Sequence, residues 1–299
     1  MSVPARALHY TGSEPTAPIP DESEVTAGTR IRPGKRYGFF TDTTLCIGCK
    51  ACEVACKEWN NLPADGMSLS GMSYDNTREL SANTWRHVKF IERISEDGQR
   101  AGEMPPYQSN WLMMSDVCKH CSNAPCLDVC PTGAIFRTEF DTVVVQNDIC
   151  NGCGYCVPAC PFGVVDVSVE DGKAHKCTLC YDRMKGGFEP ACAKSCPTES
   201  IQFGELDELD ARARKRVESL HTAGVGNAYL YGAPQSPGAT GGLERLNSFF
   251  LLTAPPEVYN LPRAPTRPAN TVAPTLARGI ATVLGLAAVA IALLAGDRS

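Results

Sequence analysis

Cysteines are the residues of this chain best suited to chemistry: there are sixteen, in four groups of four with none left over. The first two groups lie in the stretches CIGCKACEVACKEW and CKHCSNAPCLDVCP. The last two lie in CNGCGYCVPACP and CTLCYDRMKGGFEPACAKSCP. In chain order the groups are Cys46, Cys49, Cys52, Cys56; Cys118, Cys121, Cys126, Cys130; Cys150, Cys153, Cys156, Cys160; and Cys177, Cys180, Cys192, Cys196. A chain of 299 residues can build its core without disulfide bonds, so this number of cysteines indicates a chemical role.

The spacing within the groups predicts iron–sulfur clusters. A [4Fe-4S] cluster needs four thiolates, and one C-x2-C-x2-C loop can supply three of them but cannot reach the fourth position. In ferredoxins with two clusters, the cysteine after the following x3 spacer binds the other cluster, and a proline usually follows it. Proline follows Cys130, Cys160 and Cys196, whereas Lys57 follows Cys56. We therefore predict four [4Fe-4S] clusters, with all sixteen cysteines as cofactor-binding and metal ligands.

Zinc and disulfide bonds are the alternatives for these cysteines. A zinc site with four cysteine ligands usually combines two separated C-x2-C pairs, whereas the first and third groups each place three cysteines within seven residues. Cysteines three apart in a tight loop rarely meet the geometry of a disulfide bond. Both alternatives fit the spacing less well than iron–sulfur clusters do. A zinc-stabilised scaffold without redox function would be colourless and would lack acid-labile sulfide.

The second and third groups are separated only by residues 131–149, whose sequence predicts a turn, a strand, a second turn and a second strand. This pattern is typical of a compact two-cluster ferredoxin module, in which each group gives its fourth ligand to the other cluster. The first and fourth groups then pair around the outside of that module. The predicted ligand sets are cluster 1, Cys46, Cys49, Cys52, Cys196; cluster 2, Cys56, Cys177, Cys180, Cys192; cluster 3, Cys118, Cys121, Cys126, Cys160; and cluster 4, Cys130, Cys150, Cys153, Cys156.

Sequential pairing of the groups, one with two and three with four, is the competing arrangement. It leaves residues 57–117 as a long connection inside one module, which counts against it. The stretch TWRHVKFIERI at 84–94 nevertheless reads as a strand, so this connection is not structureless. The residues alone leave both pairings open.

The four cysteine motifs closely resemble the iron–sulfur (beta) subunit of membrane-bound respiratory formate dehydrogenases, over residues 37–205 and in outline over the C-terminal tail. The cysteine spacings match that family at all sixteen positions. The resemblance implies an α+β fold of two nested bacterial-ferredoxin-like modules plus one C-terminal transmembrane helix, and it supports the nested pairing. The expected domains are a flexible extension (1–36), an outer module (37–116 and 166–235), an inner module (117–165), an extended linker (236–277) and the transmembrane helix (278–296).

The resemblance also implies the function and the partners. The chain is expected to be a non-catalytic electron-transfer subunit in anaerobic respiration. Electrons would pass from a molybdopterin (Mo or W) alpha subunit, which oxidises formate, to a membrane cytochrome b (gamma) subunit and quinone. The alternative is the equivalent four-cluster subunit of a hydrogenase or of a sulfur or sulfoxide reductase. The sequence has no P-loop, HExxH or GxSxG motif, and its net charge of −5 does not favour nucleic acid as a partner.

The C-terminal stretch GIATVLGLAAVAIALLAG, at 279–296, has no charged residue. As a helix it would be about 27 Å long, enough to cross the bilayer core. Small residues recur along it at helical spacing, which favours close packing against another transmembrane helix. Three arginines precede the helix and one follows it, a pattern that predicts a cytoplasmic head, but large domains often escape this rule. The N-terminal residues contain no apolar stretch of the kind found in signal peptides, so we expect no signal peptide there. The family resemblance favours the outer (periplasmic or extracellular) face, which is our expectation.

Several other residues stand next to the cysteines. Lys50, Lys119 and Lys176 are candidates to offset cluster charge, although exposed lysine is the commoner case. His120 lies inside CKHC, but sixteen thiolates leave no ligand position for it. Residues 205–222 predict an exposed helix with acidic residues early and basic residues late.

Overall fold

The computed structural model describes residues 31–64, 71, 75, 77–92, 111–239 and 241–296. Its largest sheet has the strand order β8 (Ile201–Glu205), β1 (Tyr37–Asp42), β10 (Ser248–Leu252), β9 (Tyr229–Tyr231). Strand β1 runs antiparallel to β8 and parallel to β10, and β10 runs antiparallel to β9. Every residue of the two central strands β1 and β10 is buried, because both faces of the sheet are covered.

Helix α6 (Leu206–Thr222) covers one face of this sheet. Its buried residues Leu206, Leu209 and Ala213 pack in one cluster with Phe40 and Phe249 of the central strands. The helix predicted over 205–222 is therefore confirmed, but it is not solvated on all sides. Its apolar stripe attaches it to the sheet, while its charged residues face water.

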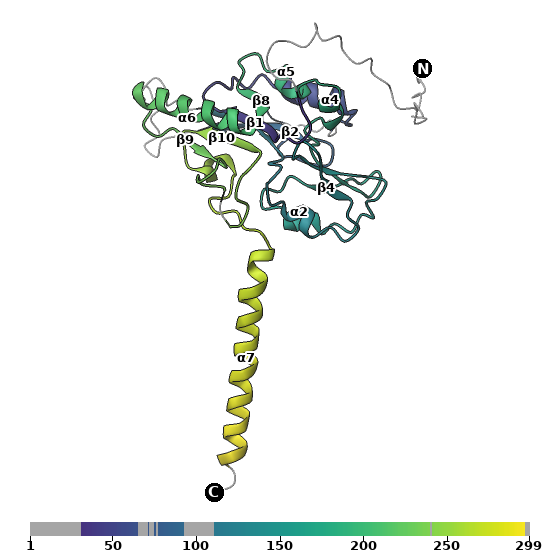
Figure 1. Ribbon diagram of the computed structural model, residues 1–299, viewed down its shortest axis with the longest axis vertical. Helices are drawn as coiled ribbons and strands as arrows, with labels where there is room; N and C mark the ends of the chain where they lie inside the picture. The colour runs from purple at the N-terminus through teal and green to yellow at the C-terminus, as the bar shows by residue number, and fades with distance from the viewer. Residues whose placement is uncertain are drawn as a thin grey trace.

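The cysteines lie on the other side of β1, among two-stranded ribbons and short helices (Figure 1). The ribbons are β2 (Arg86–Glu92) with β3 (Trp111–Val117), β4 (Ile135–Arg137) with β5 (Val143–Val145), and β6 (Asp166–Val167) with β7 (Ala174–His175). The short helices are α1 (Ala51–Asn60), α2 (Pro125–Asp128), α3 (Cys156–Ala159), α4 (Tyr181–Lys185), α5 (Ala191–Lys194) and the 3-10 helix η1 (Pro256–Tyr259). The strands predicted within 84–94 and 131–149 are present as β2, β4 and β5.

The expectation of an extended linker over 236–277 is wrong. Strand β10 lies in that range and forms the middle of the sheet, with Phe249, Phe250, Leu251 and Leu252 fully buried. A strand buried on both faces shows a continuous apolar run rather than alternation, and Pro- and Gly-rich stretches flank this one. The segment therefore completes the core before the chain leaves it. Of the predicted N-terminal extension, residues 1–30 lie outside the described part of the structure.

Helix α7 (Ala269–Gly296) projects from the folded head as a single long helix (Figure 1). It begins before the predicted start at 278, and Pro274 lies inside it near its N-terminal end. Within the part of the chain that the structure describes, no helix is both long enough and apolar enough to span a membrane. The predicted transmembrane span reaches residue 296, and the side chains of 290–296 lie outside the described residues.

Close approach of β1 to the loop before β10 requires a glycine at position 38. A Cβ atom on Gly38 would lie 1.8 Å from the backbone oxygen of Asn247, which accepts the Phe39 N–H at 2.8 Å. Gly204, the cross-strand partner of Gly38, would place its Cβ 3.6 Å from Leu209, an ordinary contact. We expect Gly38→Ala to lower the free energy of unfolding by about 2 kcal/mol or more, because backbone must move.

Urea unfolding followed by circular dichroism under anaerobic conditions measures this effect. Gly204→Ala is the matched control, and its change should stay within about 1 kcal/mol. Equal effects of the two substitutions would contradict the close approach of β1 to Asn247.

Candidate metal centres

All sixteen cysteines lie in the described part of the structure, and none of them forms a disulfide bond there. Nine are buried, five are partly exposed, and Cys49 and Cys153 are exposed. The cysteine loops contain residues in the left-handed conformation, which curl the backbone and turn successive N–H groups inward. Examples are Gly48 and Lys50, with φ of 67° and 61°, and Gly152, with φ of 72°. A curled loop of this kind surrounds a negatively charged group and donates hydrogen bonds to it.

One cavity is lined by all four cysteines predicted to bind cluster 1: Cys46, Cys49, Cys52 and Cys196. The first three come from the loop before α1 and from α1 itself, and Cys196 follows α5. Helices α1 and α5 pack together, which brings the first and fourth groups next to each other although some 120 residues separate them. The neighbours of Cys46 include Cys196 and Cys49. The structure thus gathers this set around one hollow.

The thiols predicted to bind cluster 2 also lie together. Burial first, and then the neighbouring Cys177, Cys192 and Cys180, raise the pKa of Cys56. The Leu179 N–H donates to Cys177 Sγ at 3.3 Å, and the side-chain amide of Asn60 donates to Cys56 Sγ at 3.7 Å. These donors would stabilise thiolate charge at the site.

The inner module brings the second and third groups together through contact of α2 with α3. Burial and the neighbouring Cys118, Cys160 and Cys126 raise the pKa of Cys121, so the set predicted for cluster 3 is adjacent. Burial raises the pKa of Cys156 to about 11, and Cys150, Cys153 and Cys130 add to this effect. The set predicted for cluster 4 is therefore also adjacent. The assignment of individual cysteines to clusters stays a prediction.

Burial disfavours the charged thiolate form of many of these cysteines. It raises the pKa of Cys52, Cys126 and Cys177 to about 12. Bound metal reverses this by taking the thiolate as its ligand and releasing the proton. Among the described residues, no three His, Cys, Asp or Glu side chains converge closely enough to hold a single metal ion. Thiolates around a [4Fe-4S] cluster bind four different irons, so they need not converge on one point.

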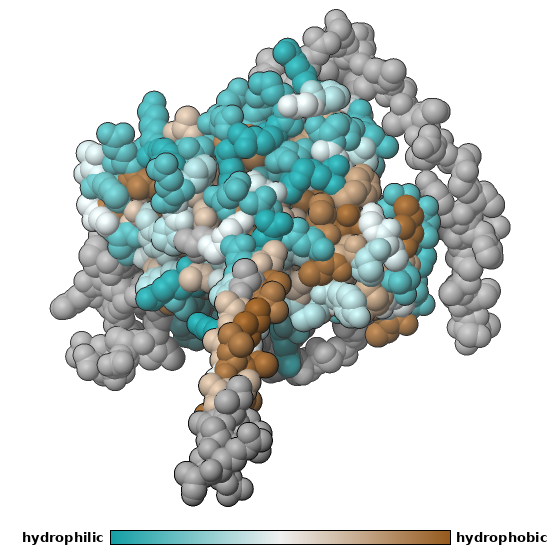
Figure 2. Space-filling view, turned by 60° about the horizontal axis from the view of Figure 1, so that its bottom comes forward, coloured by the Kyte–Doolittle hydropathy of each residue, from teal (hydrophilic) through white to brown (hydrophobic). Residues whose placement is uncertain are grey.

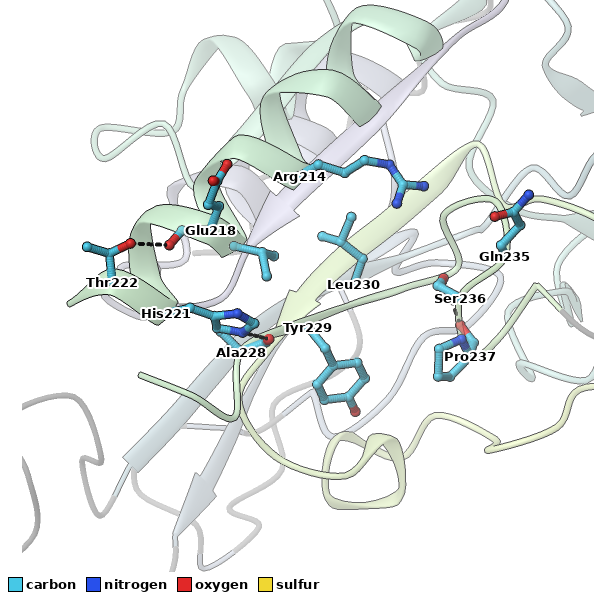
Figure 3. A pocket seen from close by; sticks show the side chains of 11 residues that line it. Arg214, Glu218, His221, Thr222, Ala228, Tyr229, Leu230, Gln235, Ser236 and Pro237 are labelled. Carbon is cyan, nitrogen blue, oxygen red and sulfur yellow. Dashed lines mark hydrogen bonds between the residues drawn. The ribbon is translucent and has the colours of Figure 1, made fainter. Parts of the chain in front are cut away.

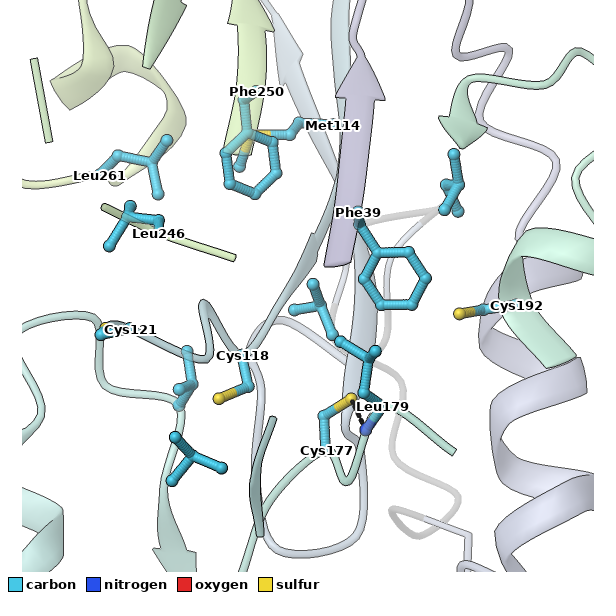
Figure 4. Packing of buried hydrophobic residues seen from close by; sticks show 14 of the residues in the cluster. Phe39, Met114, Cys118, Cys121, Cys177, Leu179, Cys192, Leu246, Phe250 and Leu261 are labelled. Carbon is cyan, nitrogen blue, oxygen red and sulfur yellow. Dashed lines mark hydrogen bonds between the residues drawn. The ribbon is translucent and has the colours of Figure 1, made fainter. Parts of the chain in front are cut away.

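The four sets follow one another in a row. Cys52 of the first set neighbours Cys192 of the second, and Cys177 of the second neighbours Cys118 of the third. Cys126 of the third neighbours Cys156 of the fourth. Figure 4 shows Cys118, Cys177 and Cys192 within one buried cluster, together with Phe39. The exposed residues Cys49 and Cys153 belong to the first and last sets of this row.

The three lysines beside cysteines have different surroundings. Lys50 is partly exposed and pairs with Glu53 and Asp75, and Lys119 is buried against Asp116. Lys176 is 2% exposed, and its Nζ donates to Cys118 Sγ at 3.5 Å. Burial opposes its charge, but the thiols around it raise the pKa of Lys176, so it stays cationic. Of the three, Lys176 is therefore the one whose charge is directed at a thiol.

His120 is fully buried, and burial, reinforced by the charge of Lys176, lowers its pKa well below the usual value. The Val143 N–H donates to His120 Nδ1 at 3.1 Å, so this nitrogen is an acceptor and the proton lies on Nε2. This neutral ring is a structural support of the loop in the described structure.

Sequence reasoning missed Arg86, which lies among thiols although no cysteine is near it in sequence.

A larger hollow of about 780 Å³ lies away from the cysteines, between α6 and residues 228–237 (Figure 3). Its polar groups already serve local structure: His221 Nε2 donates to the Ala228 carbonyl at 2.7 Å, and the Arg214 guanidinium pairs with Asp210 at 2.9 Å. No cysteine lines it, so the hollow is separate from the metal centres.

Comparison with known proteins identifies similar domains and chains. Two models described as "4Fe-4S dicluster domain" match residues 45–134 and 109–206. The formate dehydrogenase-O iron–sulfur subunit of Escherichia coli is 40% identical over 225 residues, which cover 75% of this chain and 70% of that protein. The formate dehydrogenase iron–sulfur subunit of Haemophilus influenzae is 39% identical over 228 residues, which cover 75% and 68%. The thiosulfate reductase electron transfer subunit of Salmonella typhi is 38% identical over 200 residues, which cover 66% and 91%. The prediction of four [4Fe-4S] clusters from the cysteine spacing is confirmed.

Removal of the Lys176 charge should make the third cluster harder to reduce. A charge-assisted hydrogen bond contributes about 1.5 kcal/mol, which corresponds to about 60 mV for transfer of one electron. We therefore expect Lys176→Met to lower the reduction potential of cluster 3 by about this amount. A redox titration followed by EPR measures it. Lys50→Met is the control, because carboxylates already balance Lys50. An equal shift in both variants would mean that Lys176 has no specific action on the cluster.

Proposed function

The chain belongs to the family of formate dehydrogenase iron–sulfur subunits, and we propose that it relays electrons from a molybdenum or tungsten catalytic subunit to a membrane cytochrome b subunit and quinone. It is an electron-transfer subunit without catalytic residues of its own, and its cofactors are four [4Fe-4S] clusters. Bound clusters supply one-electron redox chemistry. The catalytic partner would release two electrons from each formate, and this chain would pass them on singly.

The row of four cysteine sets is the observation that carries this proposal. Each set neighbours the next, so an electron can move through the protein in short steps. The two ends of the row, at Cys49 and Cys153, reach the surface, where partner subunits can approach. The middle sets are shielded by the core, which limits loss of electrons to solvent.

The position of α7 supports a direction for the relay. Just before this helix, the Arg267 guanidinium forms a two-pronged ion pair with Asp128 of α2, close to Cys126 and Cys130. Figure 1 shows α2 and β4 on the part of the head nearest α7, whereas α4 and α5 lie at the opposite side. The fourth cluster would therefore face the membrane partner, and the first would face the catalytic subunit.

We further propose that α7 anchors the chain in the membrane beside the cytochrome b subunit. Its side chains Leu276, Ile280, Val283 and Leu286 are more than half exposed, which needs an apolar partner. Figure 2 shows apolar surface along α7 and on the adjoining face of the head. We place the head on the outer (periplasmic or extracellular) face. Protection of the head from protease added to spheroplasts would contradict this placement.

A thiosulfate or sulfoxide reductase complex is the second candidate, because the Salmonella typhi subunit is nearly as similar to this chain. The formate dehydrogenase relatives match a larger part of the chain, 75% against 66%. The two candidates keep the same relay and differ in the catalytic subunit. Assay of the purified native complex with formate, thiosulfate and dimethyl sulfoxide distinguishes them.

Loss of one end cluster should block the relay at a defined place. In the complete complex, we expect Cys49→Ala to prevent formate from reducing the other three clusters. Cys153→Ala should leave formate able to reduce three clusters but abolish quinone reduction. Freeze-quench EPR after addition of formate, together with a quinone reductase assay, measures both. The wild-type chain should contain about sixteen irons and sixteen acid-labile sulfides. The reverse pattern in the two variants would contradict the proposed direction.

A charge on α7 should release the chain from the membrane. Arginine costs about 2.5–3.5 kcal/mol at the middle of a membrane span and less toward its ends. Val283 lies inside the predicted span at 278–296, so we expect Val283→Arg to move part of the chain into the soluble fraction. Val169→Arg, on a head residue that is 97% exposed, is the control and should leave the distribution unchanged. Fractionation and immunoblotting measure both, and unchanged attachment of Val283→Arg would rule out the anchor.

A further inference from the structure

Arg86 is a buried cation whose presence the proposed electron relay does not by itself explain. It is the first residue of β2 and is 1% exposed, among the largest fully buried side chains of the molecule. Its Nη1 donates to Ser115 Oγ at 3.0 Å, and its guanidinium carbon lies 4.7 Å from the centre of the Phe39 ring. Within the described residues, Nε and Nη2 have no hydrogen-bond partner and no carboxylate forms an ion pair with it.

A buried guanidinium without a negative partner is costly. Transfer of an unpaired ion into a protein interior costs several kcal/mol, and each unsatisfied donor adds about 1–3 kcal/mol. A fold that keeps Arg86 in this position must therefore supply negative charge close to it. Lys50, Lys119 and Arg245 differ in this respect, because each has a carboxylate partner.

The predicted clusters, with their thiolate ligands, would supply that charge. Burial opposes the charge of Arg86, but Cys192, Cys52, Cys177 and Cys56 surround it and raise its pKa. Three of these belong to the set predicted for cluster 2, and Cys52 belongs to the set for cluster 1. Ser115, which accepts from Arg86, lies 3.3 Å from Cys52 Sγ. Figure 4 shows the Phe39 ring beside Cys192 and Cys177, and the guanidinium lies over that ring. Arg86 therefore stands where the first two sets meet.

We propose that Arg86 is a positioning residue for the first two clusters: it lies between them, directs its unpartnered N–H groups at their sulfur atoms, and raises both reduction potentials relative to clusters 3 and 4. This inference rests on the proposed four-cluster relay. Reduction adds an electron to a cluster, and a fixed neighbouring cation stabilises the added charge. The effect is larger for cluster 2, because three of the thiols near Arg86, Cys56, Cys177 and Cys192, belong to that set, against Cys46 and Cys52 of the set for cluster 1.

Redox titration of the complete complex, followed by EPR, tests the proposal with three variants. Arg86→Gln removes the positive charge, and Arg86→Lys keeps the charge but lacks the planar guanidinium group. Arg245→Gln is the matched control, since Arg245 is also buried, with Nε and Nη2 lacking a hydrogen-bond partner in the described structure, but it pairs with Asp207 at 3.0 Å. Variants Cys49→Ala and Cys180→Ala identify the signals of clusters 1 and 2.

For Arg86→Gln we expect at least a tenfold fall in the ratio of reduced to oxidised cluster 2 at a fixed potential, about 59 mV for one electron. Cluster 1 should move less in the same direction, and clusters 3 and 4 should not move. Arg86→Lys should recover most of the shift, and Arg245→Gln should show none. A purely structural role would not produce this selectivity. Unchanged potentials in Arg86→Gln, or equal shifts of all four clusters, would overturn the proposal.

If the Arg86→Gln variant fails to assemble its clusters, a measurement on the wild-type protein tests the proposal instead. In wild-type protein labelled with ¹⁵N-arginine, pulsed EPR of reduced clusters 1 and 2 should detect coupling to guanidinium nitrogen. Arg86→Lys should lack this coupling, and its persistence there would overturn the proposal. Wild-type protein with fewer than four clusters would instead refute the relay itself, so the two failures are distinguishable.

Discussion

Sixteen thiolates and four clusters concentrate negative charge in a protein interior, where charge without compensation is costly. The structure compensates this charge in three ways. Left-handed residues such as Gly48 and Gly152 curl the cysteine loops, and a loop of this conformation favours a negatively charged group inside it. Backbone and amide donors reach individual sulfur atoms, as Leu179 does at Cys177. Buried cations lie at positions where no water can screen the charge. The ribbons and short helices around the centres hold these groups in place, and the large sheet holds the ribbons.

Local motifs predict the cluster ligands, because the geometry of a cluster loop is encoded within a few residues. The sequence alone identified the sixteen cysteines, the strands on either side of residue 140 and helix α6. The paired positions of β4 and β5 followed from turn residues and apolar runs. The chemistry of the centres and the β4–β5 ribbon were therefore accessible before the structure was known.

Features that depend on distant parts of the chain were not predictable in this way. Strand β10 carries an uninterrupted apolar run between Gly- and Pro-rich stretches, and only its pairing with β1 and β9 shows that it belongs to the core. Arg86 is far in sequence from every cysteine, and nothing in RHVKF separates it from an ordinary strand arginine. Its position among thiols appears only when α1, α5 and the β2–β3 ribbon are assembled. For the same reason, the sequence identifies the lysines adjacent to cysteines but does not show which of them directs its charge at a thiol.

The distribution of cations along the row follows from access to solvent. At the ends, Cys49 and Cys153 are exposed, so water can screen part of the charge of the first and last clusters. Water does not reach the second and third clusters in this way, so charged groups of the protein must balance their negative charge. Arg86 lies at the junction of the first two sets, and Lys176 lies at the junction of the second and third, against Cys118 and near Cys177. A cation at a junction acts on two clusters at once, so it stabilises the extra electron on either side of a transfer step. A cation at a junction therefore raises the potentials of its two neighbouring clusters together, and so does not open a large gap in energy across the transfer step that it flanks.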